Sequence, residues 1–250
     1  MSPLAETLAF LIFAHVLADF VLQPDRMVRA KSIGHPGWMG MHAGIVGVLA
    51  LLATGAQTQT ALFVVAGLTL AHLCIDAMKV AIGPRVSGIK AFVADQVAHL
   101  MTLAVVAILW PDLWSQGFWA PIAPQWLPAG VTVLSGSILT MRAGGYALGL
   151  LMRDWGDVGL KGLPGGGRII GVLERGIIYL LILAGEPGGI GFLIAAKSVL
   201  RFGAVREEAQ LSEYVIIGTL ASFGWAILLA TGTVMLLSAL PPLGIPDLSP

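Results

Sequence analysis

The sequence predicts an all-α fold, a polytopic transmembrane helical bundle of about eight hydrophobic segments, one of them short or re-entrant. The first observation is composition: 57% of the 250 residues are hydrophobic and 11% are charged, with a mean hydropathy of +0.88. Soluble domains carry roughly 25% charged residues. The second observation is that apolar runs near the ~20-residue length of a membrane-spanning helix follow one another along the chain. No long polar stretch is present that would form a separate soluble domain.

Glycine, proline and charged residues separate the apolar runs, as expected at the ends of hydrophobic helices. The runs cover residues 4–22, 39–54, 60–81, 90–110, 129–151, 169–185, 190–202 and 212–238. The seventh is short and rich in glycine, which indicates a half-helix or re-entrant element that protein must bury. We expect two halves: residues 1–128 carry the histidines and aspartates described below, and residues 129–250 carry a separate set of Glu, Arg and Lys charges.

Lysine and arginine recur in alternate connections, which predicts the orientation. They follow the first, third, fifth and seventh segments, whereas the connections after the second, fourth and sixth carry none. Basic loops remain in the cytoplasm. We therefore expect cytoplasmic loops near residues 24–38, 82–89, 153–168 and 203–211, with both termini outside. Trp114 and the neighbouring aromatic residues are then expected at the outer interface, where amphipathic rings settle.

Three pairs of histidine and aspartate lie one helical turn apart inside the apolar runs. They are His15/Asp19, His72/Asp76 and Asp95/His99, and a fourth histidine, His42, lies near the start of the second segment. The i,i+4 spacing puts both members of a pair on one helix face. In the predicted orientation the Asp of each pair lies nearer the cytoplasm and its His roughly 6 Å deeper, with His42 at about the level of the aspartates. Ionisable groups inside a membrane are expensive, so we expect these helices to converge on one polar site.

Imidazole and carboxylate together form a ligand set that suits Zn, Mn or non-haem Fe. The single cysteine, Cys74, excludes a thiolate cluster. We expect His15, His72 and His99 to bind a divalent metal, with Asp19, Asp76 and Asp95 as ligands or general bases and His42 as ligand or proton shuttle. The set exceeds the usual three protein ligands of a catalytic zinc, so either two ions share the site or some aspartates orient the histidines. The alternative is that each pair is a hydrogen bond between packed helices.

The second half also contains charged residues within or beside its apolar segments. Glu174 and Arg175 are adjacent, Lys197 and Arg201 share a helix face, and Glu213 opens the last segment. One interpretation makes Arg175, Lys197 and Arg201 a cradle for a phosphate headgroup or another anionic substrate. The other makes these residues acid–base pairs that lock helices together, which the nearly equal numbers of acids and bases favour.

Several stretches resemble a family of bacterial integral-membrane proteins, the domain of unknown function 3307, in its long form with a C-terminal extension. In the first half they are 15–24, 41–42, 72–79 and 95–99; in the second half, 173–175, 191–202 and 213–219. The resemblance implies a location in the bacterial inner membrane and no particular activity. The His-x-x-x-Asp helices are also similar to those of predicted membrane-bound, metal-dependent hydrolases, as an analogy at the level of the fold.

We expect a metal-dependent intramembrane hydrolase that acts from the cytoplasmic side on a lipid-linked or membrane-delivered substrate. Membrane lipids and a lipid-phosphate substrate are the expected partners, and no nucleic acid is expected. The alternatives are a proton- or ion-coupled transporter or channel and a non-catalytic membrane scaffold. A transporter should space polar residues across the whole membrane, whereas the outer halves of the first four segments are nearly free of charge. The oligomeric state stays open.

Overall fold

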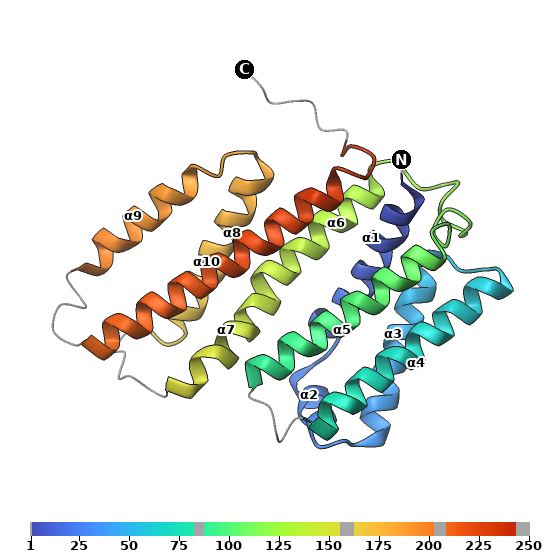
Figure 1. Cartoon of the computed structure of the whole chain (residues 1–250), viewed down its shortest axis with the longest axis horizontal. Coiled ribbons are helices and arrows are strands. Elements are labelled where there is room, and N and C mark those ends of the chain that lie inside the picture. Colours follow the sequence, from blue (N-terminus) through green and yellow to red (C-terminus); the bar gives the residue numbers. More distant parts are fainter. Residues whose placement is uncertain (1, 83–87, 156–162, 203–208, 244–250) are drawn as a thin grey trace. The chain divides into compact units, whose positions relative to one another are not determined.

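The computed structural model describes residues 2–82, 88–155, 163–202 and 209–243, and in these ranges it contains helices and no strand (Figure 1). The predicted all-α fold is confirmed. The chain divides into two compact units: unit 1 comprises residues 1–135 and 235–250, and unit 2 comprises residues 136–234. The side chains of residues 154, 200–202, 209 and 211 lie outside the described part.

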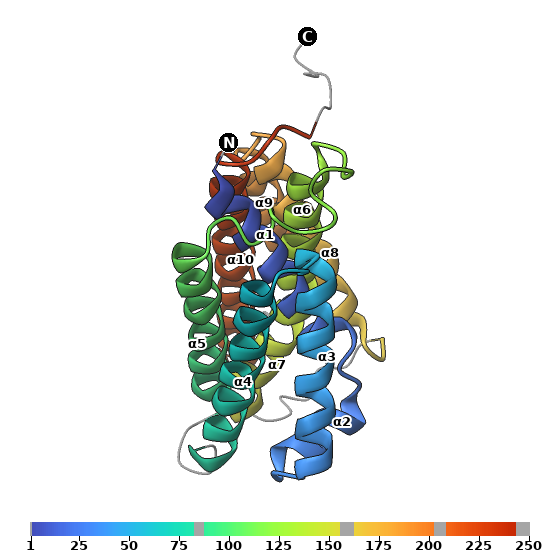
Figure 2. The same ribbon diagram turned by 90° about the vertical axis from the view of Figure 1, so that its right-hand side faces the viewer.

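Unit 1 is built on four long helices. They are α1 (Pro3–Val16), continued by the π-helical turn η1 (Leu17–Val21), α3 (Pro36–Thr54), α4 (Gln59–Ile82) and α5 (Gly88–Leu109). Helices α1 and α4 each pack against both α3 and α5. Neighbouring helices run in opposite directions, and α4 and α5 lie side by side in both views (Figures 1 and 2). Side chains near the same end of the bundle therefore lie at a similar depth, although they come from helices of opposite direction.

Local sequence signals explain where these helices begin and end. The Ser2 hydroxyl accepts a hydrogen bond from the Ala5 amide, and Pro3 occupies the first turn, where its missing N–H is not needed. Helix α3 ends at Gly55, whose φ of 61° is left-handed. A Cβ atom there would lie 2.8 Å from the Phe118 backbone nitrogen, which donates to the Gly55 carbonyl. Only glycine fits this turn.

A short amphipathic helix, α2 (Asp25–Ser32), occupies the connection between η1 and α3, which the sequence analysis treats as a loop. Its residues Met27 and Lys31 are one turn apart and both buried. Helix α2 packs against α3. Of the other expected cytoplasmic loops, residues 83–87, 156–162 and 203–208 lie outside the described residues.

The half of unit 1 that contains the chain's N-terminus has an apolar core formed by α1, α3, α4 and α5. The connection after α5 is hydrogen-bonded to α1. The Thr7 hydroxyl donates to the Pro111 carbonyl at 2.6 Å and accepts from the Trp114 amide at 3.1 Å. Trp114 is buried and stacks on Phe10, with ring centroids 3.5 Å apart. The Trp114 indole therefore completes the protein core, and its expected level at the outer interface stays a prediction. Trp126 is exposed.

Most of α6 (Leu127–Ile138) belongs to unit 1, which ends there at Ser135, and the π-helical turn η3 (Leu139–Ala143) continues it into α7 (Gly144–Met152) of unit 2. The other described helices of unit 2 are η4 (Arg153–Trp155), α8 (Gly166–Leu183), α9 (Gly189–Phe202) and α10 (Ala209–Leu237), the last as far as Val234. Helix α8 packs against η3, α7 and α9. Ile178 of α8 and Phe223 of α10 form a small apolar core on which α9 packs.

Within the described residues, five helices are long and apolar enough to cross a membrane: Pro3–Val21, Pro36–Thr54, Gln59–Ile82, Gly88–Leu109 and Ser212–Leu237. Large apolar side chains such as Phe63, Met101 and Leu228 project outward, whereas His42 and Asp76 are buried. Apolar residues outside and ionisable residues inside are the arrangement that lipid favours. Helix α9 is short, as predicted, with 14 residues.

Candidate metal centre

The structure brings all seven of the predicted His and Asp residues together in unit 1. Asp76 lies six residues before the end of α4 at Ile82, and Asp95 lies seven residues after the start of α5 at Gly88. Asp19 lies within η1, and His42 lies six residues after the start of α3 at Pro36. All four therefore sit near the end of the bundle where α2 packs. The π-helical turn that carries Asp19 is a feature often found at functional sites.

Three ligand atoms from three helices form a small triangle. The Nε2 atoms of His42 and His72 lie 3.1 Å apart, and Asp19 Oδ1 lies 3.2 Å from the first and 3.6 Å from the second. A triangle with these edges has a circumradius of about 1.9 Å, slightly less than the ~2.0–2.2 Å of zinc–imidazole and zinc–carboxylate bonds. The three atoms are therefore spaced so that one divalent ion would be held by all of them.

The orientation of these groups also suits an ion. The rings of His42 and His72 are inclined by 49°, so their in-plane lone pairs can converge. Asp19 Oδ1 is buried and makes no hydrogen bond of good geometry with any described residue. A buried carboxylate oxygen normally has a partner, and a cation bound by both imidazoles would supply one.

Asp76 lies at a fourth corner beside this triangle. Its Oδ2 atom is 3.8 Å from His42 Nε2 and 3.7 Å from His72 Nε2, longer than any edge of the triangle. The same oxygen forms a 2.6 Å ion pair with Lys31 Nζ of α2. The lysine pairs with the Asp76 carboxylate and holds one oxygen towards the two histidines. If an ion were bound within the triangle, Asp76 would lie beside it as a carboxylate able to accept a proton.

His99 and Asp95 lie on the other side of Asp76. His99 Nε2 is 3.5 Å from Asp95 Oδ1 and 4.0 Å from Asp76 Oδ1. Asp95 Oδ2 accepts from Lys79 Nζ at 2.8 Å and from the Gln96 amide at 3.1 Å. Asp95 Oδ2 is therefore already paired, whereas Asp95 Oδ1 and His99 Nε2 are both buried and make no hydrogen bond of good geometry with any described residue.

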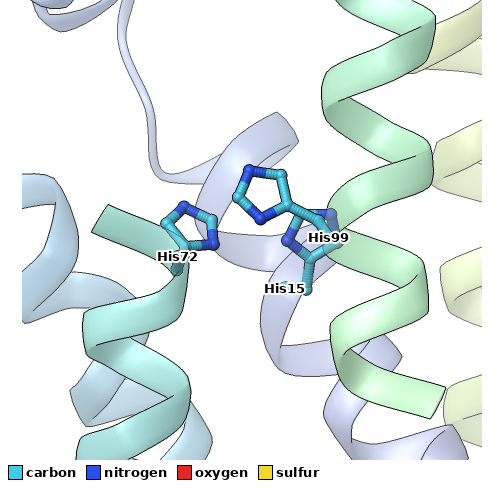
Figure 3. Close-up of side chains that lie close together, drawn as sticks. All are labelled: His15, His72 and His99. Atoms are coloured by element: carbon cyan, nitrogen blue, oxygen red, sulfur yellow. The ribbon is translucent and has the colours of Figure 1, made fainter. Parts of the chain in front are cut away.

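His15, His72 and His99, the predicted ligand set, form one cluster of rings between α1, α4 and α5 (Figure 3). His99 stacks on His72 with centroids 4.0 Å apart and planes only 24° from parallel. Stacked rings direct their lone pairs side by side, so this pair converges less well than His42 and His72. His15 Nε2 lies 3.4 Å from Gln96 Oε1 and His15 Nδ1 lies 3.8 Å from Asp19 Oδ1, which places His15 behind Asp19.

The charges of the cluster favour one ion over two. Three aspartates contribute −3 and the paired Lys31 and Lys79 contribute +2, so the site carries −1 with neutral histidines. One divalent ion with a bound hydroxide makes the site neutral. A second ion would leave an excess of positive charge in an interior where unpaired charge is costly.

Residues 7–120 match the model of a family described as protein of unknown function (DUF3307). This part of the chain is a DUF3307 domain. It contains every His and Asp of the cluster as well as Lys31 and Lys79. The match ends before the second half, so the resemblance of residues 173–219 to longer family members stays a prediction. No curated protein and no solved structure matches the chain.

The sequence analysis did not assign four polar residues that complete the site in the DUF3307 domain: Lys31, Lys79, Gln96 and Gln23. With its amide oriented to satisfy both neighbours, Gln23 accepts from Lys31 Nζ at 2.9 Å and donates to the Asp19 carbonyl at 3.2 Å. Gln96 directly follows Asp95 in the sequence, and this position could have indicated that it lies at the site. Lys31 resembles an ordinary loop charge, and only the Met27/Lys31 spacing on an amphipathic turn indicates its burial.

The charges of the second half lie in unit 2. Lys197 Nζ donates to Glu174 Oε2 at 2.7 Å. The Arg175 guanidinium donates to the Thr140 and Met141 carbonyls, both at 3.0 Å, and to the Ser222 hydroxyl at 3.2 Å. The side chain of Arg201 lies outside the described residues. Glu213 is exposed, so it is not one of the buried pairs.

Proposed function

We propose that the DUF3307 domain binds one divalent ion through Asp19, His42 and His72 and acts as a metal-dependent hydrolase. The observation that carries the proposal is the triangle of ligand atoms, with edges of 3.1, 3.2 and 3.6 Å, drawn from three different helices. Two histidines and one carboxylate leave an open coordination position, which distinguishes catalytic from structural zinc sites. Zn, Mn and Fe all accept this N/O set.

The residues around the triangle support hydrolysis. A bound divalent ion lowers the pKa of its water towards ~7 and polarises a carbonyl or phosphoryl oxygen. With an ion bound, Asp76, held by Lys31, would accept the proton of the attacking water as that water adds to the carbonyl or phosphoryl centre. The proton would then pass to the leaving oxygen as its bond to that centre breaks. His99, 4.0 Å from Asp76 Oδ1, is the second proton carrier.

We propose that the substrate is lipid-linked or delivered by the membrane and that it enters from the cytoplasmic side. The basic residues Arg26, Arg29 and Lys31 all lie on α2, next to the site. By the positive-inside rule this end of unit 1 faces the cytoplasm and both termini lie outside. The membrane is the bacterial inner membrane, by the family resemblance.

A transporter or channel is the less supported alternative. Beyond the histidines, the described part of unit 1 is filled by apolar side chains such as Leu11, Leu68 and Leu103. The cavity beside His15, His72 and His99 has a volume of about 10 Å³, enough for one water.

A scaffold is favoured by the two lysine–aspartate pairs, which neutralise two carboxylates without a metal. Metal content separates that case from the hydrolase.

Hydrolysis can be tested without knowing the substrate. The purified protein, loaded with Zn, Mn or Fe, is reconstituted with a total bacterial lipid extract in H₂¹⁸O, and the lipids are analysed by mass spectrometry. The hydrolase predicts ¹⁸O in a lipid or headgroup product, lost in Asp76→Asn and kept in Lys90→Met, an exposed control. Failure of the metal-loaded protein to incorporate ¹⁸O above the Asp76→Asn level would contradict the proposal.

A further inference from the structure

Unit 2 contains a cavity of about 330 Å³ at the end where α7 and α9 finish and α8 and α10 begin. Its lining includes Arg168, Glu174 and Arg175 of α8, Lys197 of α9, and Tyr214 and Ser222 of α10. Three basic groups face one acidic group, so the described lining carries a net charge of +2. The cavity is far larger than a single water needs.

The buried charge in this cavity belongs to Arg175, which is 3% exposed. Its hydrogen bonds to described residues go to neutral oxygens: two carbonyls of the η3 turn and one hydroxyl. The adjacent carboxylate, Glu174, is engaged by Lys197 at 2.7 Å. Among the described residues, no carboxylate forms an ion pair with Arg175, although a buried guanidinium normally has one.

The packing leaves the guanidinium little freedom to leave this position. A Cβ atom on Gly171 would lie 3.1 Å from Arg175 Nη1, and one on Gly145 would lie 3.3 Å from Nη2. Glycines at both positions therefore make room for the head group beside the cavity. Arg168, which is exposed, lines the same cavity, and no described carboxylate pairs with it either.

We infer that this cavity binds a phosphate group, carried by a lipid headgroup or by a small soluble molecule. Arginine forks match phosphate oxygens, and the Tyr214 and Ser222 hydroxyls add neutral donors. The exposed Arg168 contacts the phosphate at the opening of the cavity, and the buried Arg175 supplies a fixed positive charge in its wall. Glu174 pairs with Lys197 and so weakens the attraction of Lys197 for the phosphate. The inference concerns unit 2 alone and is independent of the metal site.

The test uses the full-length protein. In neutral detergent, inorganic phosphate and glycerol 3-phosphate are titrated by calorimetry; in parallel, the protein is placed in nanodiscs of phosphatidylglycerol or phosphatidylcholine and retained lipid is counted by native mass spectrometry. Saturable binding of a soluble phosphate identifies a free ligand. Selective retention of phosphatidylglycerol identifies a headgroup. Either supports the inference, and the absence of both overturns it.

Three variants make the test specific. Arg168→Gln should weaken binding about 10-fold or more, the loss of one charge-assisted contact. Arg142→Gln, an exposed arginine of the same unit outside the cavity lining, should leave it unchanged. Glu174→Gln should strengthen it, because Lys197 is released to the ligand. Equal weakening by Arg168→Gln and Arg142→Gln, or weaker binding by a folded Glu174→Gln, would overturn the inference.

Discussion

The Nε2 atoms of His42 and His72 lie 3.1 Å apart, one from α3 and the other from α4. Two neutral imidazoles reach this distance either by sharing one N–H proton or by binding the same cation. Asp19 Oδ1 stands within 3.6 Å of both nitrogens and favours the cation. The metal proposal depends on this contact.

Lys31→Met should destabilise the protein by about 3–5 kcal/mol, because it leaves the Asp76 carboxylate buried without its counter-ion. The 2.6 Å pair is nearly inaccessible, with side chains 11% and 6% exposed. Thermal unfolding in detergent measures the loss. Lys90→Met, at an exposed lysine, serves as the control. Lys31→Met combined with Asp76→Asn should recover most of the stability, and a double variant no better than Lys31→Met would argue against the pair.

Asp76→Asn should keep the metal, whereas Asp19→Asn should lose it. Asp19 Oδ1 completes the triangle, and Asp76 Oδ2 is farther from both histidines and is already paired with Lys31. Metal content after gel filtration, measured by plasma emission, distinguishes the two variants. If Asp76→Asn is the variant that loses the ion, Asp76 is a ligand and the assigned roles are reversed.

Glu174 and Lys197 should show a coupling energy of about 1–3 kcal/mol in a double-mutant cycle. Their 2.7 Å contact is largely shielded, with side chains 10% and 15% exposed. The cycle compares Glu174→Gln, Lys197→Met and the double variant by thermal unfolding. Additive effects within a few tenths of a kcal/mol would show that the pair does not lock α8 to α9.

Ile33 and Gln57 should lie on opposite sides of the membrane. Ile33 follows α2 and is 80% exposed, and Gln57 lies in the turn between α3 and α4. Single cysteines at these positions in a Cys74→Ser background are exposed to an impermeant maleimide in intact spheroplasts. The predicted orientation requires labelling of Gln57→Cys and protection of Ile33→Cys. The opposite pattern would place the site on the outer side.

The helical segments were predictable because each is a long apolar run with clear breaks, and all eight appear as helices within a few residues. The proximity of His15, His72 and His99 followed from their spacing and from alternating helix directions. The spacing of residues along the sequence could not predict how each helix is rotated about its own axis. That rotation places His42 opposite His72, whereas His99 stacks on the face of the same ring.

The contribution of α2 was also beyond the sequence signals. Lys31 occupies a polar, eight-residue stretch, and it is buried because α2 packs against α3 and its ammonium pairs with Asp76 of α4. The π-helical turn at Asp19 likewise has no proline or glycine within it to indicate its position. Both features come from tertiary packing, and both decide which oxygen atoms reach the histidines.

The most direct test is the metal content of detergent-purified protein after dialysis against divalent ions and removal of unbound metal. We expect about one ion of Zn, Mn or Fe per chain in the native protein and in His35→Ala, a histidine outside the cluster. His42→Ala and His72→Ala should each lower the affinity more than the ~10–100-fold caused by losing an outer-sphere partner. A native protein that binds no stoichiometric metal, or a His42→Ala variant that binds it as well as the native protein, would contradict the account.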